Sequence, residues 1–339
     1  MNKRRCAVLL LSFFSIPLLF SQERRERFVS FDNNWTVDLS LNFNFLQFDE
    51  QDLFSCRGNR PLDIGIGLRY KKIGLAFHIA LPIFTEFYHA SSESFDFNFD
   101  YIEEKFAVNT FFSSYHSFYI KNQQTKDSVV PAANTNIDLG ILSTGASFRW
   151  ILNSDIHSLR GVYKLDRQQT VSSGSPTLGV GIYYHSIYSA DKNLPGYETK
   201  QHFIYTGPLV GYSYTWIFKN NAFFNIDVVG GINPGLNASE KKFVFIPALF
   251  PNATFGYHFK TWSIATSLSI RYFIALQSYQ ILNAADRYQL SKMNWTIFKI
   301  SKRFWFIIMF VPLITNRSVP FDHIPLFGLG FSSTISQVF

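Results

Sequence analysis

The chain has few cysteines and lacks a long apolar run beyond its first residues. Its two cysteines among 339 residues are Cys6 and Cys56, and we expect Cys6 to be removed with a leader. The one remaining cysteine cannot form an internal disulfide, so disulfides contribute nothing to this fold. After the leader, the longest apolar run is Phe304 to Ile314, and Pro312 interrupts it. A spanning helix needs about 20 apolar residues, so the mature chain is predicted to contain none.

Signatures of cofactor and metal sites are also lacking. Gly65 and Gly67 fall in a strand pattern with no helix after them, unlike a phosphate-binding loop. The eight histidines are scattered, and no group of His, Cys, Asp and Glu has metal-ligand spacing. We therefore expect no cofactor and no metal ion.

The sequence offers little for a catalytic site. An acyl hydrolase needs a serine and a histidine on one strand face, oriented by a third residue. His89 and Ser91 have a suitable spacing but lie in a predicted loop, whereas His185 and Ser186 point to opposite faces of a strand. We expect a protein that is not an enzyme, and an outer-membrane lipid hydrolase is the least favoured alternative.

Charge is sparse, at 16% of residues. The net charge is +7, and the basic residues 3–5 of the leader account for three, so the mature value is 7 − 3 = +4. The tight basic clusters are residues 24–27 and 241–242, and neither is interleaved with aromatic residues at base-stacking spacing. We therefore expect no nucleic-acid partner.

The first residues have the pattern of a secretory signal. Residues 2–5 are polar and basic, Cys6 to Phe20 is apolar, and Ser21 is a small residue before a polar segment. The sequence thus predicts three parts: a signal peptide at 1–21, a short periplasmic segment at 22–34, and a transmembrane β-barrel at 35–339.

The informative feature that is present is alternation. Trp35 to Phe45 reads W-T-V-D-L-S-L-N-F-N-F, so apolar and polar residues fall on opposite faces of an extended strand. Aromatic residues reach 18% of the chain while the mean hydropathy is only +0.03. A membrane barrel accounts for both values, because it places aromatic rings on the lipid face and in the interfacial girdles. A secreted soluble sandwich, with its rings packed inward, is the alternative fold.

The same alternation recurs between turn signals along the chain. A hairpin is predicted from Leu62 to Leu81, turning at Lys71 and Lys72. Counting such segments predicts roughly 12 to 14 antiparallel strands closed into an all-β barrel. The other strand predictions are residues 95–101, 137–151, 159–165 (a weaker candidate), 178–188, 210–218, 224–232, 255–259, 262–272, 293–300, 303–313 and 325–339, and residues 106–120 form a segment of mixed pattern. Loops are predicted at residues 121–136, 191–202 and 283–292.

Two segments resemble known outer-membrane barrels. Phe339 is a terminal aromatic residue that shares one strand face with Ile335 and Phe331. This resembles the C-terminal signal read by the barrel-assembly machinery of double-membraned bacteria, although Gln337 departs from it. Asp63 to Leu75 resembles a hairpin in a family of outer-membrane barrels that is a domain of unknown function. The resemblance implies an outer-membrane location, with membrane lipid, the assembly machinery and periplasmic chaperones as partners, and it implies no activity.

Several inward positions of the predicted strands carry charge. These candidate lumen-lining residues form either a selectivity constriction or a lumenal network of ion pairs. They are Asp38, Asp63, Arg69, Arg149, Asp227 and Arg271. By contrast, Phe304 to Val311 and most of Phe243 to Phe250 are apolar on both faces. The lumen is therefore predicted to be partly apolar, or to be packed against an inward loop.

Two functions remain open besides the enzyme. The first is a narrow or substrate-selective channel for small solutes or apolar ligands, with the ligand unknown. The alternative is a structural or surface-interaction barrel without transport, whose loops at 121–136 and 191–202 bind partners.

Overall fold

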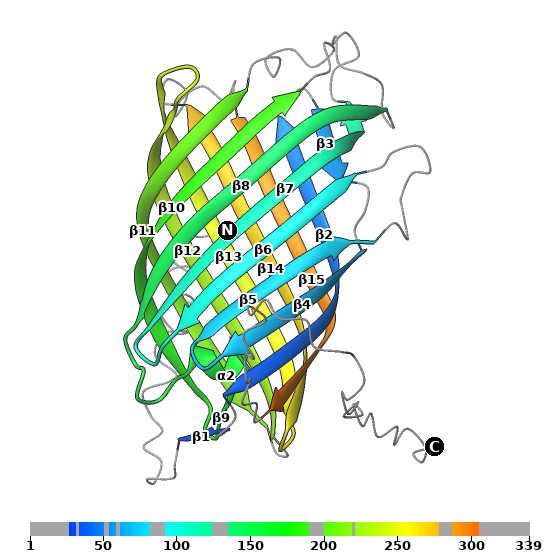
Figure 1. Cartoon of the computed structure of the whole chain (residues 1–339). Coiled ribbons are helices and arrows are strands. Elements are labelled where there is room, and N and C mark those ends of the chain that lie inside the picture. Colours follow the sequence, from blue (N-terminus) through cyan, green and yellow to red (C-terminus); the bar gives the residue numbers. More distant parts are fainter. Residues whose placement is uncertain are drawn as a thin grey trace, which may run out of the picture. The chain divides into compact units, whose positions relative to one another are not determined.

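The structure is a computed structural model in which a single closed barrel dominates (Figure 1). It describes residues 27–31, 34–50, 54–58, 62–81, 92–123, 135–189, 200–218, 221–277 and 287–304. No helix in these ranges has the length and apolarity needed to cross a bilayer.

In the part of the chain that the structure describes, the wall is built from twelve antiparallel strands. Each strand pairs with its neighbours in sequence, and the last strand pairs with the first, from Phe304 with Trp35 to Tyr288 with Glu50. The strands are β2 (Trp35–Glu50), β4 (Leu62–Tyr70), β5 (Ile73–Ala80), β6 (Glu93–Ile102), β7 (Phe106–Gln123), β8 (Asn136–Ile151), β10 (Ser173–Ser189), β11 (Gln201–Ile217), β12 (Ala222–Asn237), β13 (Lys242–His258), β14 (Trp262–Gln277) and β15 (Arg287–Phe304). The predicted closed antiparallel transmembrane barrel is confirmed.

The two ends of the barrel differ in their connections. One end, here called the turn end, carries tight turns such as Lys71–Lys72, the start of β2 and the end of β15. The opposite end, the loop end, carries longer connections, such as residues 124–135 between β7 and β8. There the short strand β3 (Phe54–Gly58) bridges β2 and β7, because β4, β5 and β6 are shorter than the other wall strands.

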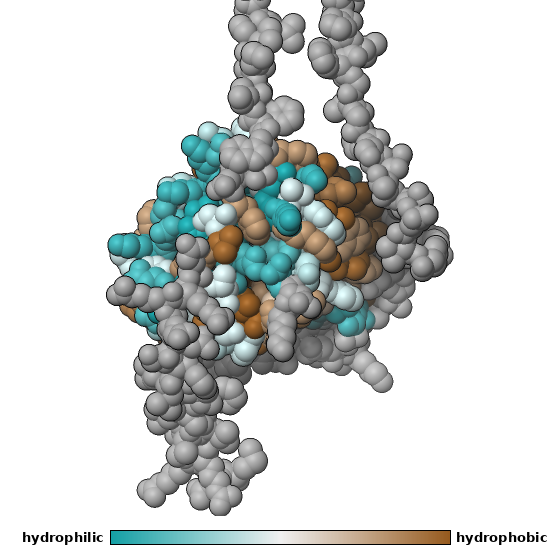
Figure 2. All heavy atoms as spheres, turned by 90° about the horizontal axis from the view of Figure 1, so that it is seen from below, coloured by the Kyte–Doolittle hydropathy of each residue, from teal (hydrophilic) through white to brown (hydrophobic). Residues whose placement is uncertain are grey.

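The predicted alternation is seen in the first wall strand. Val37 and Leu39 are 41% and 50% exposed on the outside, whereas Thr36, Asp38 and Asn42 are buried inside. Apolar outward residues recur around the wall, so the outer surface offers the apolar band that a membrane requires. Seen from the turn end in Figure 2, hydrophilic residues (teal) cover much of the described surface and apolar residues (brown) dominate one edge.

One strand prediction fails in the middle of the chain. Residues 159–165, predicted as a weak strand, contain instead the helix α2 (Leu159–Tyr163). Apolar residues in this segment pack in two directions: Leu159 lies against Ile151, and Val162 against Phe223. Such two-sided burial inside the barrel suits a helical turn, whereas a strand would need a free sheet edge that the closed wall does not offer.

The end of the barrel also differs from prediction. Residues 293–300 and the first two residues of the predicted strand 303–313 belong to one strand, β15, which begins within the predicted loop 283–292. A bulge between Thr296 and Phe298 interrupts its alternation, whereas its pairing with β2 continues through the predicted break at residues 301–302.

The remaining predictions for this region lie outside the described residues. They are the strand at 325–339 and the assembly signal of Phe331, Ile335 and Phe339. The described barrel closes without them, through β15 and β2. The leader at 1–21 and most of both predicted partner-binding loops, 121–136 and 191–202, also lie outside the described residues.

Candidate functional site in the barrel lumen

The lumen is filled, and its filling changes from polar to apolar along the barrel axis. Strand β2 shows the order from the turn end: Asp38 comes first, Asn42 and Asn44 follow, and Leu46 and Phe48 come last, all buried. We distinguish a turn-end layer, a middle layer and an aromatic layer.

The turn-end layer contains a segment that folds into the barrel. Residues 152–172 connect β8 to β10 and include α2 and the short strand β9 (Arg167–Gln169). We call this segment the insert. Its strand β9 pairs with β1 (Phe28–Ser30), so the N-terminal segment and the insert together cover the turn end.

Two arginines of the wall hold the end of α2. Arg69 donates to the carbonyl of Lys164 and forms an ion pair with Asp38. Arg303 donates to the carbonyl of Leu165 at 2.8 Å. The last carbonyls of a helix lack partners within the helix and carry partial negative charge, so guanidinium groups are well suited to this position.

A second set of contacts joins the insert to the wall strands β8 and β12. Asp227 on β12 accepts a hydrogen bond from Tyr163 of α2 and forms an ion pair with Arg149 on β8, with a nitrogen–oxygen distance of 2.8 Å. All three side chains lie within the barrel, and the backbone pairing alone would not bring them together because β8 and β12 are not neighbours.

Two ionisable groups of the insert have shifted pKa values. Burial lowers the pKa of Lys164 to about 8, and the Asp100 carboxylate, 3.4 Å from its ammonium group, opposes the shift. Burial also lowers the pKa of His157 to about 4. Both groups therefore favour their neutral forms more than they would in water.

The His157 shift predicts that acid destabilises the insert. The unfolded chain protonates this histidine below pH ~6.5 and the folded chain only below about 4, so the unfolded state binds more protons between these values. Stability should fall as the pH drops through this window, by up to about 3 kcal/mol. As the pH falls through this window, the urea midpoint in detergent micelles should decline less steeply in His157→Gln than in the wild type. Parallel pH profiles would contradict the prediction.

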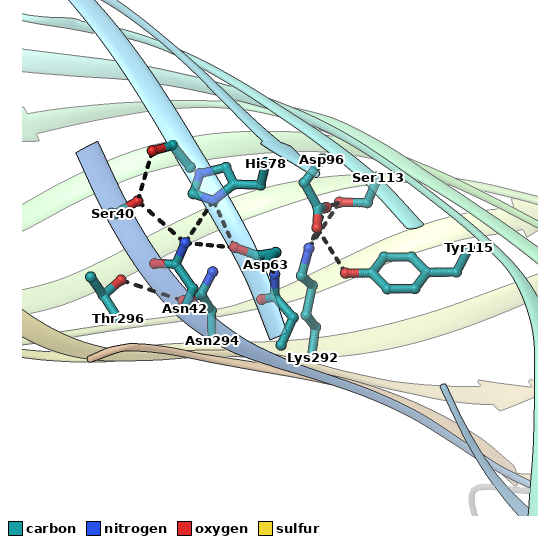
Figure 3. A network of polar contacts seen from close by, with 12 residues as sticks. Ser40, Asn42, Asp63, His78, Asp96, Ser113, Tyr115, Lys292, Asn294 and Thr296 are labelled. Atoms are coloured by element: carbon teal, nitrogen blue, oxygen red, sulfur yellow. Dashed lines mark hydrogen bonds and ion pairs between the residues drawn. The ribbon is translucent and has the colours of Figure 1, made fainter. Parts of the chain in front are cut away.

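The middle layer is a hydrogen-bonded network across several strands (Figure 3). Asp63 on β4 accepts from Asn42 at 2.6 Å and from Asn44 of β2, and lies 3.4 Å from His78 Nδ1. Arg271 of β14 reaches across the lumen and donates to Asn98 of β6 at 2.9 Å. Each charge therefore has a partner with which it can remain in the lumen.

Asp96 is the centre of the second half of this layer. It forms an ion pair with Lys292 and accepts hydrogen bonds from Ser113 at 2.5 Å and Tyr115 at 2.8 Å (Figure 3). Beside this network lies a cavity of about 30 Å³ lined mostly by polar residues, which is room for one or two water molecules.

The aromatic layer lies next to Arg271, toward the loop end. We define it as Phe111, Tyr183, Tyr205, Phe250 and Phe273, whose rings contact one another directly or through Tyr183. Further apolar side chains continue it to the loop end as a packed core. The guanidinium of Arg271 lies 4.2 Å from the centre of the Phe111 ring, where the polar and aromatic layers meet.

The structure also pairs a serine with a histidine. Ser143 Oγ lies 2.7 Å from His185 Nδ1, at a cavity of about 10 Å³. The residues are 42 positions apart, so sequence spacing alone could not pair them. His89 and Ser91 lie outside the described residues, and within the described ranges no group of three metal-ligating side chains is found.

The six candidate residues fall into two of these layers. Asp38, Arg69, Arg149 and Asp227 belong to the turn-end layer, whereas Asp63 and Arg271 belong to the middle layer. The sequence prediction omits Asp96, Lys292, Lys164 and Arg303. Asp96 alternates with two phenylalanines, so its parity indicates an inward side chain, whereas Lys292 falls at the end of the predicted loop 283–292.

Together, the fold and the layers define a closed transmembrane β-barrel with a filled lumen. The profile of a domain of unknown function, DUF4421, matches residues 28–300, and the chain belongs to this family. No curated protein matches the chain.

Several solved barrels are similar to it at low identity. The toluene transporter TodX of P. putida shares 9% identity over 81% of this chain and 91% of its own, with a TM-score of 0.29. The outer membrane protease OmpT of Escherichia coli shares 7% over 83% and 99%, with a TM-score of 0.33. A Pseudomonas aeruginosa FadL homologue shares 7% over 80% and 91%, with a TM-score of 0.26.

Proposed function

We propose that this protein is a gated, substrate-selective conduit of the outer membrane, closed at rest by its insert. The outward apolar band supports the membrane location. In barrels of this kind the short turns face the periplasm and the longer loops face outward, which puts the turn end and the insert on the periplasmic side. Membrane lipid, the assembly machinery and periplasmic chaperones are the partners that this location implies.

The observation that carries the proposal is the polarity of the wall behind the insert. The turn end is lined by Arg69, Asp38, Arg149, Asp227 and Arg303, and all five contact the insert directly or through one partner. If the insert withdraws, these side chains are left facing a space that water can fill. If these side chains served only to pack against the insert, apolar residues would stabilise the barrel more, because buried ion pairs contribute little net stability.

The layers above the insert define what such a conduit accepts. A solute that passes the turn-end layer meets the polar middle layer and then the aromatic layer. This order favours a small molecule with an apolar or aromatic body over a large hydrophilic one. It also argues against a wide aqueous pore.

A structural or interaction barrel without transport is the second candidate. The apolar core at the loop end favours it, since its buried residues, such as Phe48, Phe118 and Ile137, are packed like the interior of a soluble domain. The proposal includes no catalysis: the cavity beside Ser143 and His185 holds about one water molecule, too little for a substrate.

Replacing residues 153–175 with a short Gly-Ser turn tests the conduit. The turn rejoins Leu152 and Pro176, which are already hydrogen-bonded at 3.1 Å. In planar bilayers the wild type should give rare or no conductance steps, and the variant should give steps at least tenfold more often.

A mobility shift between folded and boiled samples on a detergent gel controls for folding. Glu104→Ala, which removes an exposed ion pair with Arg167 of the insert, is the matched control and should behave like the wild type. A correctly folded deletion variant that stays silent and takes up no small solute into liposomes would favour the structural barrel.

A further inference from the structure

Among the prolines of the described wall strands, four interrupt the pairing of adjacent strands, whereas Pro176 of β10 lies in a continuous pairing with β11. Pro208 lies in β11, Pro234 in β12, and Pro247 and Pro251 in β13. Proline has no backbone N–H, and in sheets it is normally confined to edges and bulges. Here every strand is paired on both sides, so the four prolines need an explanation.

The pairing pattern shows where the hydrogen bonds are missing. Between β11 and β12, the pairing stops after Tyr205 with Gly235 and resumes at Leu209 with Gly231, without a change of register. The gap covers Pro208 and Pro234. Pairing of β11 with β10 and of β12 with β13 continues past these positions. The missing donors of both prolines therefore face each other's strand across the β11–β12 seam.

A second seam has the same defect. Pairing between β13 and β14 is interrupted at Pro247 and again at Pro251. The hairpin β12–β13 is thus continuous within itself but less completely bonded to the wall on both sides. Inside a bilayer each backbone carbonyl without a hydrogen bond costs free energy, so these two seams are the least stable contacts between strands of the wall.

On the lumenal side of the β11–β12 seam, each inward pair at the gap contains one glycine, opposite Tyr205, Leu209 or the buried Asn233. These glycines are Gly207, Gly231 and Gly235, and a Cβ on any of them would lie 2.4 to 2.5 Å from a carbonyl oxygen of the facing strand. The two backbones therefore touch directly. The β13–β14 seam differs, since the rings of Phe250 and Phe273 stand behind it.

The surroundings of the β11–β12 seam suit an apolar molecule on both sides. On the outside, Ile204 is 48% and Ile232 is 63% exposed. On the inside, Tyr205 is buried, and its ring stacks on Tyr183 with centroids 5.3 Å apart. An apolar molecule crossing here leaves the hydrocarbon, passes the buried amide of Asn233, and meets aromatic rings without passing a charged group.

We propose that the β11–β12 seam is a lateral passage for small aromatic or otherwise apolar molecules. Such molecules move through it between the membrane interior and the aromatic layer. The inference rests on the proposed conduit and names its substrate class and its membrane-side opening. The seam is closed at rest, and the two absent hydrogen bonds lower the cost of separating the strands.

A membrane-soluble photoprobe tests the passage. 5-Iodonaphthyl-1-azide is added to liposomes containing the full-length protein and activated by light, and labelled peptides are mapped by mass spectrometry. The wild type should be labelled both at lipid-facing Leu178 and at lumenal Tyr183 or Tyr205. A disulfide between Ile204→Cys and Leu236→Cys, which are paired outward positions beside the gap, should lower lumenal labelling about tenfold.

The matched control is a disulfide of the same kind in an uninterrupted seam. Val180→Cys and Phe148→Cys pair β10 with β8 and should leave lumenal labelling unchanged. A second variant, Pro208→Ala with Pro234→Ala, restores both donors and should also lower it, whereas Pro176→Ala, in a continuous pairing, should not.

Two results would overturn the passage. One is a lumen that is never labelled, and the other is lumenal labelling that survives the Ile204–Leu236 cross-link. Neither bears on the conductance of the insert-deletion variant, so failure of the lateral passage is distinguishable from failure of the proposed conduit.

Discussion

The Asp227→Ala variant is expected to be about 3 to 5 kcal/mol less stable than the wild type and to release the insert. The substitution leaves the buried Arg149 guanidinium without its carboxylate and removes the acceptor for the Tyr163 hydroxyl. An unpaired buried charge costs more than the ion pair contributes, so this loss should exceed that of any exposed ion pair. Urea unfolding of the reconstituted protein measures it.

The same variant should raise the frequency of conductance steps, though less than deletion of the insert does. Asp227→Asn retains an acceptor for Tyr163 and should give a smaller loss of stability. Glu104→Ala, at an exposed ion pair of the insert, is the control and should change the free energy of unfolding by less than about 1 kcal/mol. Equal effects of Asp227→Ala and Glu104→Ala would show that Asp227 does not hold the insert.

The second large effect is expected at the Asp96–Lys292 pair of the middle layer. Lys292→Met should cost about 3 to 5 kcal/mol, because it leaves a buried carboxylate with only the Ser113 and Tyr115 hydroxyls as donors. Asp96→Asn should be costly for the corresponding reason, since it leaves a buried ammonium.

The double variant Asp96→Asn with Lys292→Met should recover most of the loss, because neither charge is then left alone in the lumen. A double-mutant cycle of urea unfolding gives the coupling free energy, expected to exceed about 2 kcal/mol. Additive single effects would mean that water in the adjacent cavity, rather than the partner residue, solvates each charge.

Local pattern was enough to predict the wall. Trp35 to Phe45 predicts its faces correctly because side-chain alternation follows from strand geometry alone, whatever the neighbouring strand. The same parity places Asp38, Asp63 and Asp227 inside the barrel. A bulge limits this rule in β15, because one extra residue reverses the face of all the residues that follow.

The contents of the lumen were much harder to predict. Asp96 and Lys292 are 196 residues apart, and Asn98 and Arg271 are 173 apart. Parity shows that such a side chain points inward, but it carries no information about which strand lies across the lumen. Ser143 and His185 are different, because they are direct partners on the neighbouring strands β8 and β10, and the register of that pair spans the insert.

The sequence by itself determined the kind of wall: antiparallel strands, apolar outside, with charged residues inside. Tertiary structure alone decided that the barrel closes between β15 and β2, that residues 152–172 fold inward, and that prolines of neighbouring strands align at shared seams. The physical reason is the range of the interactions. Alternation is determined within each strand. Barrel closure, the position of the insert and the alignment of prolines instead depend on the register between strands, which only the assembled barrel sets.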